Sequence, residues 1–282
     1  MSRWLREIQA LDPERDAERI VFLDAALEFP WDTQRSLELG FYRTYAVPSI
    51  AELLYSTGEF TSRAQKRYDD TLILISAFCE HGYDSDFGRR AIRRMNHIHG
   101  RFAISNDDYL YVLSTMVFEP IRWNARFGWR PLLDAEKQAT FFFWREVGRR
   151  MGMSGLPESY DDFARFNVEF ERERFGYTDA GHRVAAATRD MFLGWIPGLP
   201  KHAGRQLIYA LLDEPLLDAL GFPHPSALLR GSVETAVRAR SRAIRLMPAR
   251  RRSRLRTLER HRSYPDGYRL ESLGPPPADA IG

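Results

Sequence analysis

The sequence predicts an all-α protein with one globular, multi-helix domain and room inside for a cofactor-sized pocket. Apolar residues recur at helical spacing along most of the chain, and no Asn-Gly or Asp-Gly turn separates alternating apolar runs. Hydrophobic residues make up 44% and aromatic residues 13% of the 282 residues. That content is enough to build a core that also encloses a cavity.

Prolines and capping residues delimit the expected helices. Asn106 or Asp107 can cap the helix that follows them, and Ser159 with Asp162 forms an acidic variant of the capping box. The prolines expected between helices are Pro30, Pro48, Pro120, Pro131, Pro157, Pro197, Pro223 and Pro248. The expected helices cover residues 13–28, 33–46, 48–57, 62–81, 86–103, 107–118, 134–151, 159–174, 179–195, 201–220 and 226–246.

The chain shows no internal repeat and no long linker, so we expect one helical domain over residues 1–248. A basic, Pro- and Gly-rich tail over 249–282 follows it and is expected to be irregular. The single cysteine, Cys79, permits no intrachain disulfide, and the N-terminus lacks the apolar segment of a signal peptide. The longest apolar runs, 72–79 and 109–118, are too short to span a bilayer. These features predict a cytoplasmic protein.

Positive charge is concentrated near the C-terminus. Residues 230–262 contain twelve Arg and two acids, a local charge of +10 in a chain whose net charge is +3. Two interpretations stay open: an Arg-rich helix that packs on an acidic body, or a segment that contacts an anionic membrane peripherally. We expect no nucleic-acid partner. Only three of the 41 basic residues are Lys, a bias typical of bacterial genomes rich in G and C.

Several common catalytic motifs are absent. The sequence has no GxxxxGK[ST], GxGxxG, CxxC, HExxH or ExxH pattern, which argues against P-loop proteins, classical dinucleotide folds and ferritin-like di-iron bundles. The pair Asp69-Asp70 raises the possibility of a terpene synthase. No third acid follows in the next helical turn to share Mg²⁺, so we set this interpretation aside.

One histidine stands out. On a helix through residues 87–102, His97 shares a face with arginines, whereas His99 lies on an apolar face. A buried imidazole must satisfy its ring nitrogens, either by hydrogen bonds to a neighbouring helix or by binding a metal. Gly100 follows directly, and its missing side chain leaves space beside the backbone. The residues on the face of His99 are Ile92, Met95, Phe102 and Ala103.

The preceding helix carries Arg67 and Thr71 on one face, four residues apart, and the same face continues into the core. A buried arginine is unfavourable unless it meets an anion or a polar network. That anion could belong to a bound cofactor or oxygen species. The alternative is a structural ion pair with Asp70 or another acid.

Four segments resemble the MpaB-type oxygenase family, which shares its catalytic domain with the bacterial rubber oxygenases (latex-clearing proteins). They are QKRYDDT (65–71), RRMNHIHG (93–100), NDDYLYVLSTMVFEPIR (106–122) and WREVGRRMGM (144–153). The resemblance extends from about residue 28 to about residue 273. It implies an all-α fold with a b-type haem held by a single His. It also implies the use of O₂ to cleave carbon–carbon double bonds of isoprenoids.

The resemblance assigns the cofactor site residue by residue. The His-Gly pattern of the family falls on His99 and Gly100, which makes His99 the axial ligand of the iron. Met95, on the same face as His99, would contact the haem.

The catalytic residues follow in the same way. The Arg-x-x-x-Thr pair of the rubber oxygenases, on the side where O₂ and substrate bind, falls on Arg67 and Thr71. A proposed base upstream falls nearest to Glu52, with Glu59 behind it. Where the rubber oxygenases have a Lys before the Thr, this chain has Asp70, of opposite charge.

These observations predict a haem b-dependent oxygenase, or a related oxidoreductase. Its substrates would be O₂ and an apolar, isoprenoid-like small molecule. The alternative is a non-catalytic α-helical carrier that keeps the pocket and has lost the haem.

Overall fold

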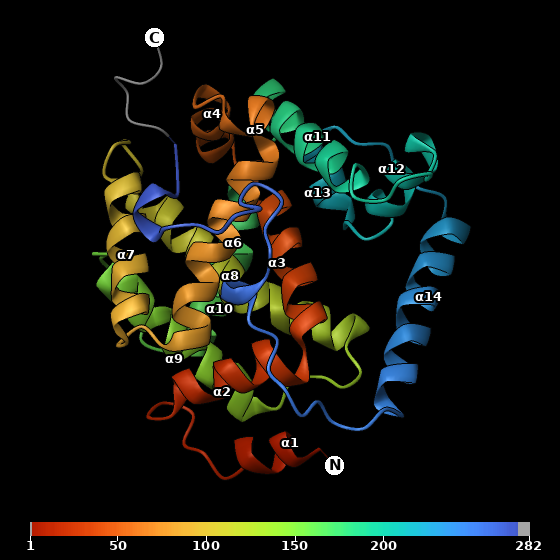
Figure 1. Ribbon diagram of the computed structural model, residues 1–282. Coiled ribbons are helices and arrows are strands. Elements are labelled where there is room, and N and C mark those ends of the chain that lie inside the picture. The colour runs from red at the N-terminus through yellow and green to blue at the C-terminus, as the bar shows by residue number, and fades with distance from the viewer. Residues whose placement is uncertain (1, 276–282) are drawn as a thin grey trace.

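A computed structural model describes residues 2–275 and confirms the all-α fold. Over this range no β-strand forms, and a single isolated bridge joins His261 and Tyr264. The helices form one domain (Figure 1), with a main apolar core and two smaller buried apolar clusters. None of the helices in this range is long and apolar enough to cross a membrane.

Three pairs of helices pack along each other: α3 (Pro30–Tyr45) with α8 (Asn106–Phe127), α6 (Ala64–His81) with α7 (Asp86–His99), and α2 (Ala17–Leu23) with α9 (Asp134–Arg150). The first part of the chain supplies α2, α3, α6 and α7 to these pairs. Its elements are α1 (Arg3–Ile8), α2 (Ala17–Leu23), the π-helical turn η1 (Asp24–Glu28), α3 (Pro30–Tyr45), α4 (Pro48–Ser56), α5 (Glu59–Ser62), α6 (Ala64–His81) and α7 (Asp86–His99).

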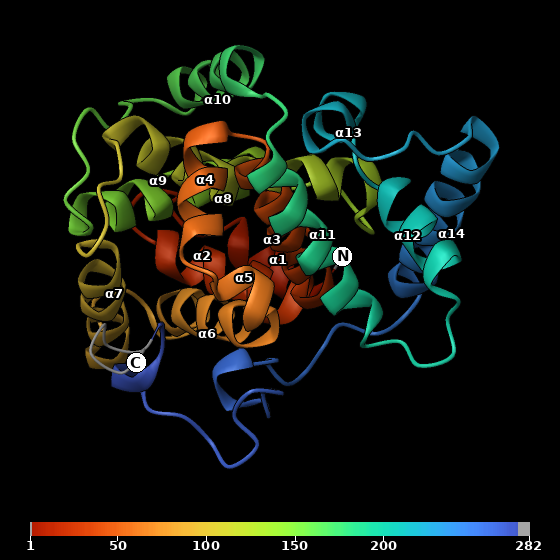
Figure 2. The same cartoon turned by 90° about the horizontal axis from the view of Figure 1, so that it is seen from above.

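The second part completes the bundle and extends it to one side. Figures 1 and 2 show α7 and α14 at opposite ends of the molecule. The elements are α8 (Asn106–Phe127), α9 (Asp134–Arg150), α10 (Tyr160–Arg174), α11 (Asp179–Leu193), α12 (Lys201–Tyr209), α13 (Glu214–Leu220), α14 (Ala227–Arg245), η2 (Arg256–Leu258) and η3 (Leu270–Ser272).

The expected end of a helix before Pro120 is wrong, because α8 continues through this proline to Phe127. A proline inside a helix removes one backbone hydrogen bond and costs about 3 kcal/mol. Burial on both sides of the proline offsets that cost, since Val117, Trp123 and Phe127 are all buried. The expected helix 201–220 is in turn two helices, α12 and α13. Asp213 caps the second helix, which begins at Glu214 and has Pro215 as its second residue.

The capping predictions had mixed outcomes. Ser159 caps α10 as expected, with Oγ accepting a hydrogen bond from the backbone N–H of Asp162 at 3.1 Å. The cap of α8 is Ser105 instead of Asn106 or Asp107, because the Ser105 hydroxyl reaches the N–H of Asp108 at 3.1 Å.

The C-terminal segment is irregular apart from η2 and η3, and it lies against the bundle. Leu270 and Leu273 are buried and belong to the main core. The predicted tail boundary at residue 249 stays a prediction, and residues 276–282 of that tail lie outside the described residues.

Candidate active site

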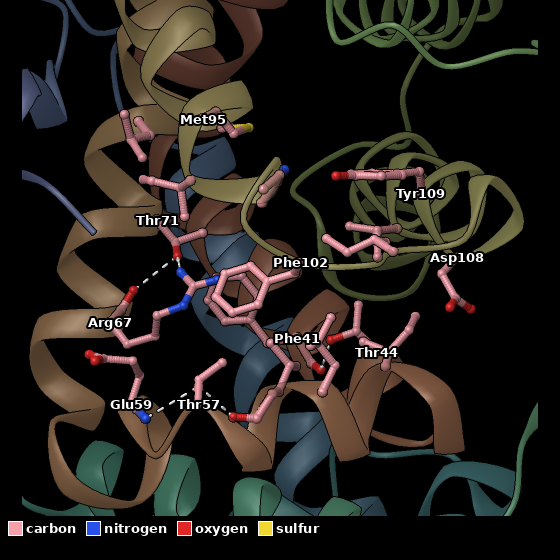
Figure 3. A pocket seen from close by; sticks show the side chains of 18 of the residues that line it. Phe41, Thr44, Thr57, Glu59, Arg67, Thr71, Met95, Phe102, Asp108 and Tyr109 are labelled. Carbon is pink, nitrogen blue, oxygen red and sulfur yellow. Dashed lines mark hydrogen bonds between the residues drawn. The ribbon is translucent and has the colours of Figure 1, made fainter. Parts of the chain in front are cut away.

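A cavity of about 460 Å³ lies between α3, α4, α6, α7 and α8. Its volume falls in the range of roughly 300–1,000 Å³ that small-molecule and cofactor sites occupy. Apolar side chains form most of its wall, with a few polar groups among them. Figure 3 shows Met95 and Phe102 with the polar groups of Arg67 and Thr71 in this cavity.

His99 lines this cavity, as its apolar face predicts. Met95, Phe102 and Ala103 from the same face also line it, while His97 on the other face is exposed. His99 is the last residue of α7, and the chain turns directly after it. The end of the helix therefore presents the imidazole to the cavity.

The imidazole of His99 has an unpartnered ring nitrogen and a lowered pKa. Its Nδ1 is buried and has no hydrogen-bond partner among the residues that the structure describes. Burial, reinforced by the positive charge of Arg67, lowers the pKa of His99 to about 4. The ring is therefore neutral at neutral pH, which is the state in which histidine binds metals. The ring of Tyr109 lies beside it, with ring centroids 5.6 Å apart.

Arg67 and Thr71 face the cavity together from α6 (Figure 3). The guanidinium of Arg67 donates to the Thr71 hydroxyl, which donates to the backbone carbonyl of Arg67 at 2.9 Å. The guanidinium also lies over the ring of Phe60, 5.2 Å from its centroid. Burial lowers the pKa of Arg67. Thr71 thus holds the cation at the edge of an apolar cavity.

Arg67 has no ion pair with a carboxylate in the described part of the chain. The alternative of a structural ion pair with Asp70 is therefore wrong, because Asp70 pairs with Lys66 at 2.7 Å. Arg67 is half-buried and forms no ion pair there, so an anionic group of a ligand would be a favourable partner for its guanidinium.

The structure places two of the predicted residues outside the cavity. Glu52 is exposed on α4, whereas Glu59 is buried and lines the cavity, where it forms an ion pair with Arg63. Gly100 is exposed and forms the C-terminal cap of α7 without lining the cavity. The two acids differ because α4 directs Ile50, Leu53 and Leu54 to the cavity and leaves Glu52 on its exposed side, whereas Glu59 begins α5 at the cavity wall.

Among the described residues, His99 is the histidine that lines the cavity. Within residues 2–275, no group of three or more His, Cys, Asp or Glu side chains is placed to hold a metal ion. A haem iron needs only an axial ligand from the protein, because the macrocycle supplies the other nitrogens. His99 with its unpartnered nitrogen fits such a ligand, and the apolar wall fits the macrocycle.

Comparison with known proteins identifies relatives over most of the chain. The family model for the "ER-bound oxygenase mpaB/B'/Rubber oxygenase, catalytic domain" matches residues 38–257. The chain is 33% identical over 234 residues to the ER-bound oxygenase mpaB of Penicillium roqueforti (strain FM164), covering 76% of this chain and 78% of the relative. It is 28% identical over 221 residues to the ER-bound oxygenase mpaB' of Penicillium brevicompactum, covering 72% of this chain and 52% of the relative.

A solved structure agrees with this assignment at the level of the fold. The latex clearing protein LCP in the closed state superposes with a TM-score of 0.54 and 14% sequence identity, covering 86% of this chain and 70% of that chain. The sequence relatives named above are fungal, and the bacterial origin of this chain stays a prediction. The extent of the family match and the similarity to the Penicillium roqueforti protein show that the chain is an oxygenase of the family that comprises mpaB, mpaB' and the rubber oxygenases.

Proposed function

We propose that this oxygenase depends on haem b and uses O₂ on an apolar, isoprenoid-like small molecule. The observation that carries the proposal is the unpartnered Nδ1 of His99 in an apolar cavity. A buried polar atom without a partner is unfavourable, so its presence in a cavity calls for a ligand.

His99 would hold the iron, and Met95 would pack against the macrocycle from one turn earlier on α7. When bound, the haem supplies the activation of O₂, which no amino-acid side chain provides. The cavity wall excludes bulk water from that site and offers an apolar surface to the substrate. Gly100 has no part in this proposal, because it lies outside the cavity.

The polar residues have separate tasks. Arg67 offers a fixed positive charge to an anionic group in the cavity, and Thr71 holds its guanidinium in place. Glu59 replaces Glu52 as the acid that we propose for proton transfer, since its carboxylate belongs to the cavity wall. Its ion pair with Arg63 keeps it beside the cavity.

A carrier that has lost its haem is the second candidate, and one observation favours it. Histidines that bind metals nearly always donate their other ring N–H to a carbonyl or carboxylate, which orients the ring. If Nδ1 is the nitrogen that binds the iron, the other nitrogen is Nε2, and Nε2 has no such partner among the residues that the structure describes.

Titration of the purified protein with hemin separates the two candidates. A haem oxygenase develops a Soret band at one equivalent, and the band shifts when dithionite and CO are added. A protein that stays colourless with added hemin supports the carrier and contradicts haem dependence.

We also propose that the protein works in the cytoplasm and contacts anionic membranes peripherally, without binding nucleic acid. At the C-terminal end of α14, Leu246 and Met247 are 87% and 66% exposed, next to the exposed Arg245. Exposed Arg250–Arg252 follow within a few residues. Apolar side chains among arginines match an anionic lipid surface. We call residues 245–252 the basic patch.

A further inference from the structure

The last described residues, 263–275, form a strap that lies along α6 and α7 (Figures 1 and 2). Buried Leu270 and Leu273 attach the strap to the core, and Gly274 and Pro275 line the cavity. The family model ends at residue 257, so the strap lies beyond the matched domain. It nevertheless contributes to the wall of the proposed active site.

The acidic pair of α6 binds the strap. The backbone N–H of Ser263 donates to Asp69 Oδ2 at 2.8 Å. The hydroxyl of Tyr264 donates to Asp70 Oδ1, and the backbone N–H of Gly274 donates to Asp70 Oδ2 at 3.0 Å. Asp70 is only 2% exposed. The buried carboxylate of Asp70 therefore binds the strap at both Tyr264 and Gly274, and Asp70 directly precedes Thr71 on α6.

Two cations complete this attachment. Lys66 Nζ donates to Asp70 Oδ2 at 2.7 Å and to the carbonyl of Gly274 at 2.9 Å. Arg94 Nε, on α7, donates to the carbonyl of Leu273 at 2.8 Å. The charge of Asp70 is thus compensated, and the strap backbone is bonded to both helices.

The strap backbone packs closely against Ile98 of α7, next to the proposed iron ligand His99. Gly274 has a φ of +93°, and a Cβ placed on it would lie 2.6 Å from Cδ1 of Ile98. Ile98 directly precedes His99. Only glycine allows this backbone conformation and this contact without a shift.

We propose that the strap is the specificity wall of the cavity, which limits the width of the ligands that enter, and that Asp70 is the positioning residue that holds it. Loss of either Asp70 or the close contact at Gly274 would move the wall outward and admit bulkier ligands. The inference rests on the proposed function only in taking the cavity as the ligand site.

The test uses full-length Asp70→Asn and Gly274→Ala, with Glu271→Gln as the matched control. Glu271 also belongs to the strap, but its partner Arg90 is at the surface. Backbone hydrogen exchange of residues 263–275 should become about tenfold faster in Asp70→Asn. The reason is that hydrogen bonds to the charged carboxylate stabilise the closed strap, and their weakening makes local opening about tenfold more frequent. Glu271→Gln should exchange like the wild type. Circular dichroism verifies that each variant is folded.

Ligand selectivity is measured on the hemin-free protein with the apolar fluorophore N-phenyl-1-naphthylamine. The fluorophore is displaced by slim 1-decanol or by bulky adamantan-1-ol. Both cavity variants should shift the ratio of the two affinities toward adamantan-1-ol, and Glu271→Gln should not.

Each result has a defined consequence. Unchanged exchange in Asp70→Asn overturns its positioning role, and faster exchange with an unchanged affinity ratio overturns the specificity wall. A parallel hemin titration judges the proposed function independently. If no variant binds hemin but the ratio shifts, haem dependence fails while the strap inference stands.

Discussion

Arg67 and His99 line the same cavity, and burial together with the positive charge of the Arg67 guanidinium lowers the pKa of His99 to about 4. The two residues come from successive helices, α6 and α7. Neither has a carboxylate partner in the described chain. The pair therefore combines a neutral imidazole with a cation that forms no ion pair among the described residues.

Replacement of His99 tests the ligand directly. His99→Ala should weaken hemin binding by more than about 100-fold. Mutation of residues that merely orient a metal ligand already lowers metal affinity by roughly 10–100-fold, so loss of the ligand itself should lower it further. The protein should stay helical, since the site lies in a cavity wall. His97→Ala on the same helix is the control and should keep a normal Soret band. A normal band in His99→Ala, with loss of the band in His97→Ala, would show that the wrong histidine has been assigned.

The pH dependence of hemin binding follows from the lowered pKa of His99. A base with a lowered pKa stays neutral until the pH falls through that value. Hemin affinity should therefore hold constant from pH 8 to about 5 and fall only near pH 4. A decline that begins near the ordinary value of 6.5 would contradict the buried, neutral imidazole.

Removal of the charge at residue 67 should raise the pKa of His99. In Arg67→Met the value moves up from about 4 but stays below 6.5, because burial is the larger cause and persists. Titration of the His99 C2 proton by NMR measures the shift. Arg89→Met, an exposed substitution on the helix of His99, should leave it unchanged. An unaltered titration in Arg67→Met would remove the electrostatic link between the two residues.

The buried carboxyl group of Asp24 should make the stability of the protein depend on pH. Asp24 is 8% exposed and neither carboxylate oxygen has a hydrogen-bond partner among the described residues. Burial, followed by the nearby charge of Glu136, raises the pKa of Asp24 well above its usual value. Because the folded pKa is the higher one, the contribution of Asp24 to stability is full at low pH and is lost as the pH rises through the folded pKa.

Asp24→Asn carries no charge at any pH, so it should become more stable relative to the wild type as the pH rises. The gain is at most about 1.4 kcal/mol per pH unit between the two pKa values. Urea unfolding at pH 5 and pH 8 measures it, with the exposed Asp266→Asn as the control. An equal effect of Asp24→Asn at both pH values would show that the carboxyl titrates normally.

The basic patch should bind anionic lipid. The full chain should co-sediment with vesicles of phosphatidylserine and phosphatidylcholine at low salt. It should detach at about 0.5 M salt, where the Debye length is only a few ångströms. Leu246→Ser with Met247→Ser should weaken binding, whereas Leu228→Ser, 82% exposed at the other end of α14, should not. Absence of binding at low salt would leave the arginines with intramolecular roles, such as the ion pair of Arg240 with Asp32 at 3.0 Å.

Much of the fold is readable from local pattern, because helical periodicity and capping depend on residues close together in the chain. The failure at Pro120 shows the limit. A local rule ends the helix there, but burial against α3 and other distant segments continues it. The face of His99 was also predictable, since three and four residues along a helix suffice to define it.

Contacts between distant segments decided the rest of the site. Local patterns suffice for the all-α class, for the inward face of His99 and for the placement of Arg67 and Thr71 on one face, because each depends on residues within a turn or two of helix. Only the tertiary structure placed Glu59 rather than Glu52 at the cavity and gave Asp70 the strap as its partner. The physical reason is that these contacts join residues up to 204 positions apart, and no local periodicity encodes which segments the chain brings together.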